Sequence, residues 1–560
     1  MKKLSIWISV TVAVVAVTLT AVALVVMNRG NAGGDYTKAV DDNSVAVVRF
    51  DAYQVLQKSG VYNELVNIIK AELQKEGAPS YIVSLADDLR NSGIDVQAPM
   101  YAYATVLDNS VGLAAVVAKV HSKVKLNQLA NMIVNEANLS KHEYDDCTVI
   151  PIDKNVAIAY NDVAIIFGGV EALGYSRPTK SIEAYLTEAL NNAANGAAGG
   201  SVLPAYEGSD IAACFNLNSL IDILKLSIQE SYNSDIAQSI AQLEQFRNSK
   251  FDLAMNFAQG SIDLSAQVSN LPDFGYQFTP CTDENLKYVS ADAWAVVNLP
   301  LDGSVGVKQL KDMFAQDSNM RNLINQELAS ATNGMVNNVQ SVMTIAEPLI
   351  SSLKGNLTAA INNVTISQVY DPYYYNYRTD SYGGMRLKEE VDACAIVNVT
   401  NNSIWNFAQN WVTMIPNLKQ VGSSMYMVEE DDLRGYFGQQ NNALFASTPN
   451  PLVMVANPAT QAVWYPEVKD GYGYAVINLA AILANPTVRN EAVKEIESEL
   501  GSSSYGAIQL LDSLNYLVCN VDAPGSMSLR LVLKNNRENV LTQLVNMVKF
   551  EIMKELNGNY

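Results

Sequence analysis

The sequence AVVNL at residues 295–299 decides how the chain is organised, because three close relatives of it occur elsewhere. They are AVVRF from Ala46, ACFNL from Ala213 and AVINL from Ala475, and each has the apolar composition of a short β-strand. The intervals between the four copies are long, short and long again, and a further short stretch follows the last copy. We therefore expect a tandem duplication of a long repeat followed by a short repeat.

The segments between these strands follow the same order in both long repeats. After Ala46 come a helix, a hairpin that turns at residues 108–110, an amphipathic helix and three short strands, and the order recurs after Ala295. Each short repeat closes with a hairpin whose turn contains Gly-Ser, at Gly260 and at Gly525. Strands joined by hairpins and interrupted by long helices predict an α+β fold, with antiparallel or mixed sheets and helices packed on one face.

This repeat predicts two α+β lobes behind an N-terminal segment. The boundary between the lobes falls in LPDFGYQFTPCTDEN, a stretch rich in proline and acidic residues that is typical of a linker. The predicted limits are 1–34 for the membrane segment and linker, 35–275 for the first lobe (long repeat 35–190, short repeat 202–275) and 286–560 for the second lobe (long repeat 286–450, short repeat 467–560).

The N-terminal segment predicts that the chain enters a membrane. Lys2 and Lys3 precede an uncharged run over residues 4–27, which as a helix of about 36 Å crosses a hydrocarbon core of about 30 Å. The lysines favour a cytoplasmic N-terminus, which sends the rest of the chain across the membrane. We expect one transmembrane helix, a single-pass protein of the cell membrane and a periplasmic bulk. The alternative is a signal peptide cleaved near Gly30 and Ala32.

Composition and charge limit the classes of function. The 560 residues are 49% hydrophobic and 17% charged, which is the composition of a globular protein. A net charge of −20 repels phosphate backbones, so we expect no nucleic-acid partner. Five cysteines are too few, and odd in number, for a disulfide framework, and only Cys147 and Cys281 lie in polar surroundings that suit a bridge.

Short motifs in the chain are similar to those of a known bacterial family. They are KSG at residues 58–60, SGID at 92–95, GNLTAAINNVT from Gly355 and LRLVLKNNRENVLTQLVNMV from Leu529. These motifs resemble the envelope proteins grouped as domain of unknown function 4836. The resemblance implies an exported or lipoprotein-like protein of anaerobic Gram-negative bacteria with no assigned activity. It transfers no catalytic residue, and because the chain lacks the lipoprotein cysteine, attachment by the N-terminal helix is expected.

The sequence contains no constellation of catalytic or metal-binding residues above chance. Phosphate-cradling, zinc-protease and EF-hand patterns are absent from it. Ser-x-x-Lys occurs at Ser122 and Ser351 without the companion motifs of the penicillin-interacting enzymes. His121 and His142 are the only histidines, which leaves little room for a Ser/His/Asp triad. We predict no catalytic residue, no metal and no cofactor.

A tyrosine-rich run, YDPYYYNYRTDSYGG at residues 370–384, stands where the first long repeat has only a short turn. An exposed tyrosine offers a flat apolar face and a hydroxyl group, which suit a sugar ring or a protein partner. The candidate binding residues are the six tyrosines Tyr370, Tyr373, Tyr374, Tyr375, Tyr377 and Tyr382. The alternative is a hairpin extension that packs back on its own lobe.

Three functions are consistent with these observations. The leading hypothesis is a non-enzymatic envelope protein that binds or scaffolds a protein or glycan partner. One alternative is a periplasmic hydrolase that uses carboxylates from loops, which a deep pocket with facing carboxylates would favour. The other is a carrier of a lipid or another apolar ligand, which a cavity lined by an apolar sheet face would favour.

Overall fold

The structure is a computed structural model, and its chain divides into two compact units. Unit 1 comprises Met1–Pro272 together with Asn535–Tyr560, and unit 2 comprises Asp273–Lys534. The residues described are 34–547, except 61–66, 68–91, 108–110, 145, 173–179, 197–201, 230–242, 273–278, 317, 332–337, 377–380, 413–416, 431–432 and 502–503.

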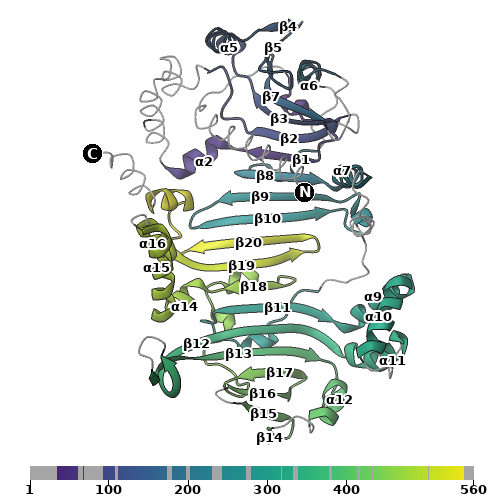
Figure 1. Ribbon diagram of the computed structural model, residues 1–560, viewed down its shortest axis with the longest axis vertical. Helices are drawn as coiled ribbons and strands as arrows, with labels where there is room; N and C mark the ends of the chain where they lie inside the picture. The colour runs from purple at the N-terminus through teal and green to yellow at the C-terminus, as the bar shows by residue number, and fades with distance from the viewer. Residues whose placement is uncertain are drawn as a thin grey trace. The chain divides into compact units, whose positions relative to one another are not determined.

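Unit 1 is built on an antiparallel sheet whose ten described strands appear in Figure 1. In spatial order they are β4 (His142–Tyr144), β5 (Cys147–Pro151), β6 (Val156–Tyr160), β7 (Ala164–Ala172), β3 (Val111–Lys119), β2 (Met100–Leu107), β1 (Ala46–Phe50), β8 (Ile211–Asn216), β9 (Lys250–Phe257) and β10 (Ser261–Ser269). Its helices are η1 (Tyr36–Ala39), α2 (Ala52–Ser59), α5 (Lys123–Ala137), α6 (Ile182–Asn195), α7 (Leu217–Gln229) and η3 (Glu244–Phe246).

Unit 2 orders its ten described strands in the same way. They are β14 (Leu418–Gly422), β15 (Met425–Glu430), β16 (Leu433–Gln440), β17 (Ala443–Thr448), β13 (Ser381–Val399), β12 (Leu353–Asn376), β11 (Ala295–Asp302), β18 (Tyr474–Ile477), β19 (Leu514–Ala523) and β20 (Ser526–Leu533). Its helices are η4 (Glu284–Tyr288), α9 (Gly303–Gln316), α10 (Ser318–Ala331), α11 (Val339–Ile350), α12 (Ser403–Val412), η5 (Ala459–Gln461), α13 (Tyr465–Val468), α14 (Leu479–Leu483), α15 (Pro486–Leu500) and α16 (Ser504–Ser513).

In unit 1, helices cover both faces of the strands β5 and β6. Leu186 and Leu190 of α6 are fully buried in a core that includes Val149. On the opposite face, Leu126 of α5 packs in a second cluster with Ile150. Because successive side chains of a strand point to opposite faces, Val149 and Ile150 face different helices. This part of the sheet is therefore a three-layered structure.

In unit 2, short helices and connecting segments cover one face of the sheet. Trp464 and Leu286, both fully buried, pack in one core with Val296 of β11 and Ile396 of β13. The longer helices lie beyond the strand ends, with α9, α10 and α11 at one end and α14, α15 and α16 at the other (Figure 1). The helices α9 and α11 bury their apolar side chains against each other, as the cluster around Val307 and Met343 shows.

The predicted fold class is therefore wrong. All pairings of the described strands are antiparallel, so the sheets are not mixed, and the long helices of unit 2 do not pack on one sheet face. Amphipathic helices need an apolar neighbour, and here the neighbour is another helix. Among the described residues no helix is long and apolar enough to cross a membrane, and residues 1–33, which carried the prediction of a transmembrane helix, lie outside them. The predicted lobe limits stay a prediction.

Residues 535–543 pack on unit 1, to which they belong. The Gly260 amide donates to the Glu538 carbonyl over 2.9 Å, and the Asn539 side-chain amide donates to the Phe257 carbonyl over 2.8 Å. The Thr542 hydroxyl donates to the Lys58 carbonyl over 2.7 Å. These bonds attach the segment to the β9–β10 hairpin and to the end of α2.

Replacing Gly260 tests this attachment. Gly260 has a φ of +67°, and a Cβ atom there would lie 2.5 Å from the Cα of Asn536. We expect Gly260→Ala to lose about 1 kcal/mol for the left-handed backbone and about 1–3 kcal/mol more for the displaced segment, measured by urea unfolding. Gly208→Ala is the matched control, because Gly208 has a φ of +86° and no atom near the position of a Cβ. Equal losses in the two variants would contradict the close approach.

Candidate functional site

The tyrosine run forms the outer part of a long hairpin made by β12 and β13 (Figure 1). These strands have 24 and 19 residues, whereas β2 and β3 at the same place in unit 1 have 8 and 9. Tyr375 pairs with Tyr382 near the tip, and Tyr370 pairs with Met385. An ion pair of 2.8 Å between Arg386 and Asp371 links the two strands.

Three of the six predicted binding tyrosines project into solvent. Tyr370 is 67% exposed, Tyr373 86% and Tyr382 75%, so these side chains do not pack back on the unit. Tyr374 and Tyr375 lie on β12, but their side chains are outside the description, and Tyr377 lies outside the described residues. The structure brings the Tyr370 hydroxyl against Gly383, where a Cβ would lie 2.5 Å from it. A binding role for these tyrosines stays a prediction.

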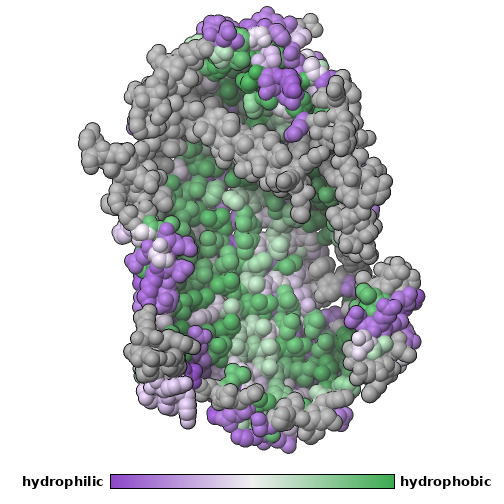
Figure 2. Space-filling view, in the orientation of Figure 1, coloured by the Kyte–Doolittle hydropathy of each residue, from purple (hydrophilic) through white to green (hydrophobic). Residues whose placement is uncertain are grey.

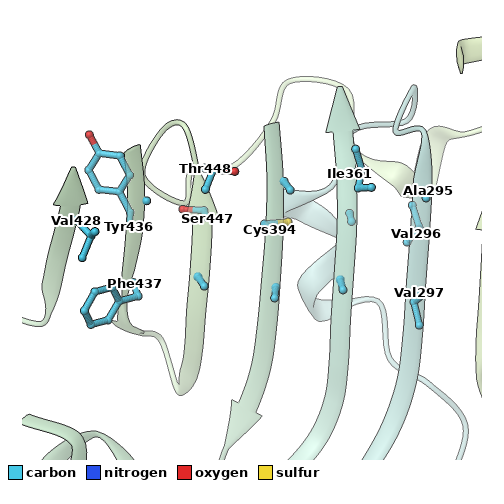
Figure 3. Close-up of a pocket in the computed structure, with 16 residues that line it drawn as sticks. Ala295, Val296, Val297, Ile361, Cys394, Val428, Tyr436, Phe437, Ser447 and Thr448 are labelled. Carbon is cyan, nitrogen blue, oxygen red and sulfur yellow. The ribbon is translucent and has the colours of Figure 1, made fainter. Parts of the chain in front are cut away.

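At the base of this hairpin, an apolar groove of about 570 Å³ crosses six strands of unit 2. The strands are β15, β16, β17, β13, β12 and β11 in that order (Figure 3). The groove lies on the sheet face that the core of unit 2 does not use, and Figure 2 shows hydrophobic residues gathered on this face. It was not predicted from the sequence.

The floor of the groove consists of small side chains in register across the strands. Ala395 of β13 pairs with Ala359 on one side and with Ala446 on the other. Larger side chains stand at the two ends of this row, Phe437 on β16 and Val297 on β11. A row of alanines between larger residues leaves a channel, because the methyl groups do not fill the space above the strands.

Two of the same three register positions in unit 1 carry larger residues. Val116 of β3 stands between Ala102 and Phe167, as Ala395 stands between Ala359 and Ala446. Val116 is buried, and the Phe167 ring adds volume that the methyl group of Ala446 lacks. The groove of unit 2 therefore results from small residues at positions that hold large ones in unit 1.

A buried polar network beneath the groove fixes this register. The Asn285 side-chain amide donates to the Thr358 hydroxyl over 3.1 Å and to the Asn398 side-chain oxygen over 3.0 Å. The Thr358 hydroxyl donates to the Asn298 side-chain oxygen over 2.8 Å. A slip of one residue would leave these buried groups without partners, which costs about 1–3 kcal/mol for each group.

The polar groups along the groove are already used within the chain. The Ser447 hydroxyl donates to the Asn450 carbonyl and the Thr448 hydroxyl to the Val391 carbonyl, each over 2.8 Å. Glu429, next to the groove residue Val428, accepts bonds from Arg434 and Lys419 at the surface. These bonds lower the pKa of the Glu429 carboxyl, with the bond from Arg434 the larger cause. The groove offers hydrophobic contact and few free polar groups.

The serines of the Ser-x-x-Lys motifs cap helices, and the cysteines form no disulfide. The Ser122 hydroxyl caps α5 by accepting the Lys125 amide over 3.4 Å, and Ser351 closes α11. All five cysteines lie in the described part and are free, so Cys147 and Cys281 form no disulfide. Burial raises the pKa of the Cys281 thiol to about 11. Within the described ranges, no group of three or more His, Cys, Asp or Glu gathers as metal ligands.

Comparison with known proteins gives one family. The family model described as "Domain of unknown function (DUF4836)" matches residues 36–541. No curated protein matches the chain. Crystal form IV of TP0453 is similar at 9% identity over 42% of this chain and 81% of that chain, with a TM-score of 0.22. Crystal form III of TP0453 is similar at 10% identity over 43% of this chain and 82% of that chain, with a TM-score of 0.21. TM-scores this low do not indicate a shared fold.

The exposure of the tyrosines predicts that they contribute little to stability. We expect Tyr373→Ala and Tyr382→Ala to change the free energy of unfolding by less than about 0.5 kcal/mol, as surface substitutions do. Ile396→Ala, at a fully buried position of the same hairpin, should cost about 2–5 kcal/mol. Urea unfolding measures all three. A loss above 1 kcal/mol for either tyrosine variant would mean that its side chain packs on the unit.

Proposed function

The chain belongs to the family of domain of unknown function 4836, and we propose that it is a non-enzymatic binding module. The proposed ligand is an amphipathic molecule with a linear hydrocarbon chain. The alanine-floored groove of unit 2 is the observation that carries this proposal. Its volume of about 570 Å³ lies within the range of about 300–1,000 Å³ that ligand sites occupy.

The shape of the groove favours a straight, thin ligand. Six strands about 4.8 Å apart give the groove a length of roughly 24 Å across the sheet. Ala359, Ala395 and Ala446 form a continuous floor along this direction. Each methylene group buried there contributes about 0.8 kcal/mol, part of which offsets the entropy lost on association.

The chemistry of the lining disfavours other ligands. A sugar would place hydroxyl groups against methyl groups, and each unpaired hydroxyl costs about 1–3 kcal/mol. An extended peptide would place its own amides there without partners. A hydrocarbon chain has no such groups, and its polar head can lie in solvent at the Val428 end of the groove.

We also propose that the chain acts in the cell envelope. The uncharged run at residues 4–27 behind two lysines supports export, although it lies outside the described residues. The exposed tyrosines of the β12–β13 hairpin support a second contact, with a protein partner of the envelope, because tyrosine is enriched at protein interfaces.

Filling the groove tests the proposal. Dansyl-labelled undecanoic acid serves as the probe, and its fluorescence on binding to the full chain should give a saturable curve. We expect Ala446→Phe to raise the dissociation constant at least tenfold, about 1.4 kcal/mol, because the ring occupies the channel. Phe167 holds the corresponding position in unit 1, so this sheet accommodates a phenyl ring there.

Ala213→Phe is the matched control, since Ala213 lies on β8 of unit 1, outside the groove. Far-ultraviolet circular dichroism verifies that both variants fold. Binding of equal strength by Ala446→Phe and the unmodified chain, or no binding by the unmodified chain, would overturn the proposed function.

A further inference from the structure

A second cavity, in unit 1, has the opposite chemistry to the groove. Its volume is about 460 Å³, and it lies against the outer side of α6, next to β4. Most of the side chains that line it are polar or aromatic, and they include Tyr144, Glu183, Thr187, Glu188, Asn191 and Asn192. This cleft plays no part in the function proposed above.

The helix that lines the cleft is held in place by the core. Leu186 and Leu190 of α6 are fully buried against the sheet. Glu183, Thr187 and Asn191 follow one another at intervals of four residues, so they form a row on one side of the helix, the side next to β4 and β5. The positions of these polar groups are therefore fixed relative to the sheet.

Tyr144 forms an aromatic wall of the cleft, and its ring is fixed at two points. Its hydroxyl donates to a carboxylate oxygen of Glu183 over 2.5 Å, and the same oxygen lies 3.0 Å from the His142 Nδ1. The His142 ring meets the Tyr144 ring edge to face, with centroids 6.4 Å apart. Tyr144 is still 42% exposed, so part of its surface is available to a ligand.

The two carboxylates that line the cleft already have partners. Glu188 forms an ion pair of 2.9 Å with Lys180, and Glu183 accepts from Tyr144 and lies beside His142. The Tyr144 hydrogen bond, followed by the bond with His142, lowers the pKa of the Glu183 carboxyl, so this acceptor stays ionised at neutral pH. A cation would compete with these partners, whereas a neutral ligand rich in hydroxyl groups adds hydrogen bonds without displacing them.

We propose that this cleft binds a saccharide. The ring carbons of the sugar stack on Tyr144, whose ring gives a flat apolar surface, and the hydroxyl groups bond to the planar side chains of Glu188 and Asn191. Amides and carboxylates suit this role because each presents two polar atoms, which reach neighbouring hydroxyl groups of one sugar. The proposal does not depend on the hydrocarbon groove.

Saturation-transfer difference NMR on the full chain tests this site, with glucose, galactose, mannose, N-acetylglucosamine, cellobiose, lactose and chitobiose as probes. We expect transfer to the ring protons of at least one probe. Tyr144→Ala should remove the signal, and Tyr144→Phe, which keeps the ring but loses the bond to Glu183, should weaken it. Asn191→Ala changes an exposed side chain, so the chain should still fold. We expect this variant to bind the same probe with an affinity at least tenfold lower.

Tyr505→Ala, at a tyrosine of α16 that is 56% exposed, is the control for a general effect of exposed tyrosines, and it should leave the signal unchanged. Ala446→Phe should also leave it unchanged, which separates this site from the groove. The absence of transfer to every probe would overturn the proposal. A signal that survives both Tyr144→Ala and Asn191→Ala would overturn it as well, because the sugar would then bind elsewhere.

Discussion

A β-strand with apolar side chains on both sides needs cover on two faces, and this requirement shapes both units. In unit 1, α5 covers one face of β5 and β6, and α6 covers the other. In unit 2 the short segments around Trp464 cover one face, while α9, α10 and α11 pack on one another. The other face of unit 2 is left with the apolar groove.

The two faces of the unit 2 sheet have different roles. The covered face holds large side chains such as Ile396 and the buried amide network of Asn285, Asn298 and Asn398, which sets the strand register. The open face carries the alanines that this register aligns. Adjacent residues of a strand belong to opposite faces of the sheet. The register that the buried amides set on the covered face therefore also fixes the alignment of the alanines on the open face.

The sequence was informative wherever a signal is local. AVVNL at residues 295–299 lies within β11, and the turns at Gly260 and Gly525 join β9 to β10 and β19 to β20. Helix packing was not predictable, since an amphipathic stripe does not identify its neighbour. The groove was missed although alanines recur at alternate positions of β13, because their alignment with β12 and β17 depends on long-range pairing. Tyr144 and α6 likewise meet only in three dimensions.

The attachment of residues 535–543 to unit 1 determines the order in which the molecule can be completed. Unit 2 occupies the chain between the two parts of unit 1, so a ribosome finishes all of unit 2 before it makes Asn539 and Thr542. Until then the carbonyls of Phe257 and Lys58 lack the donors that the finished molecule supplies. Unit 1 is thus the first unit whose synthesis begins and the last to be completed, and unit 2 can fold before unit 1 has its C-terminal segment.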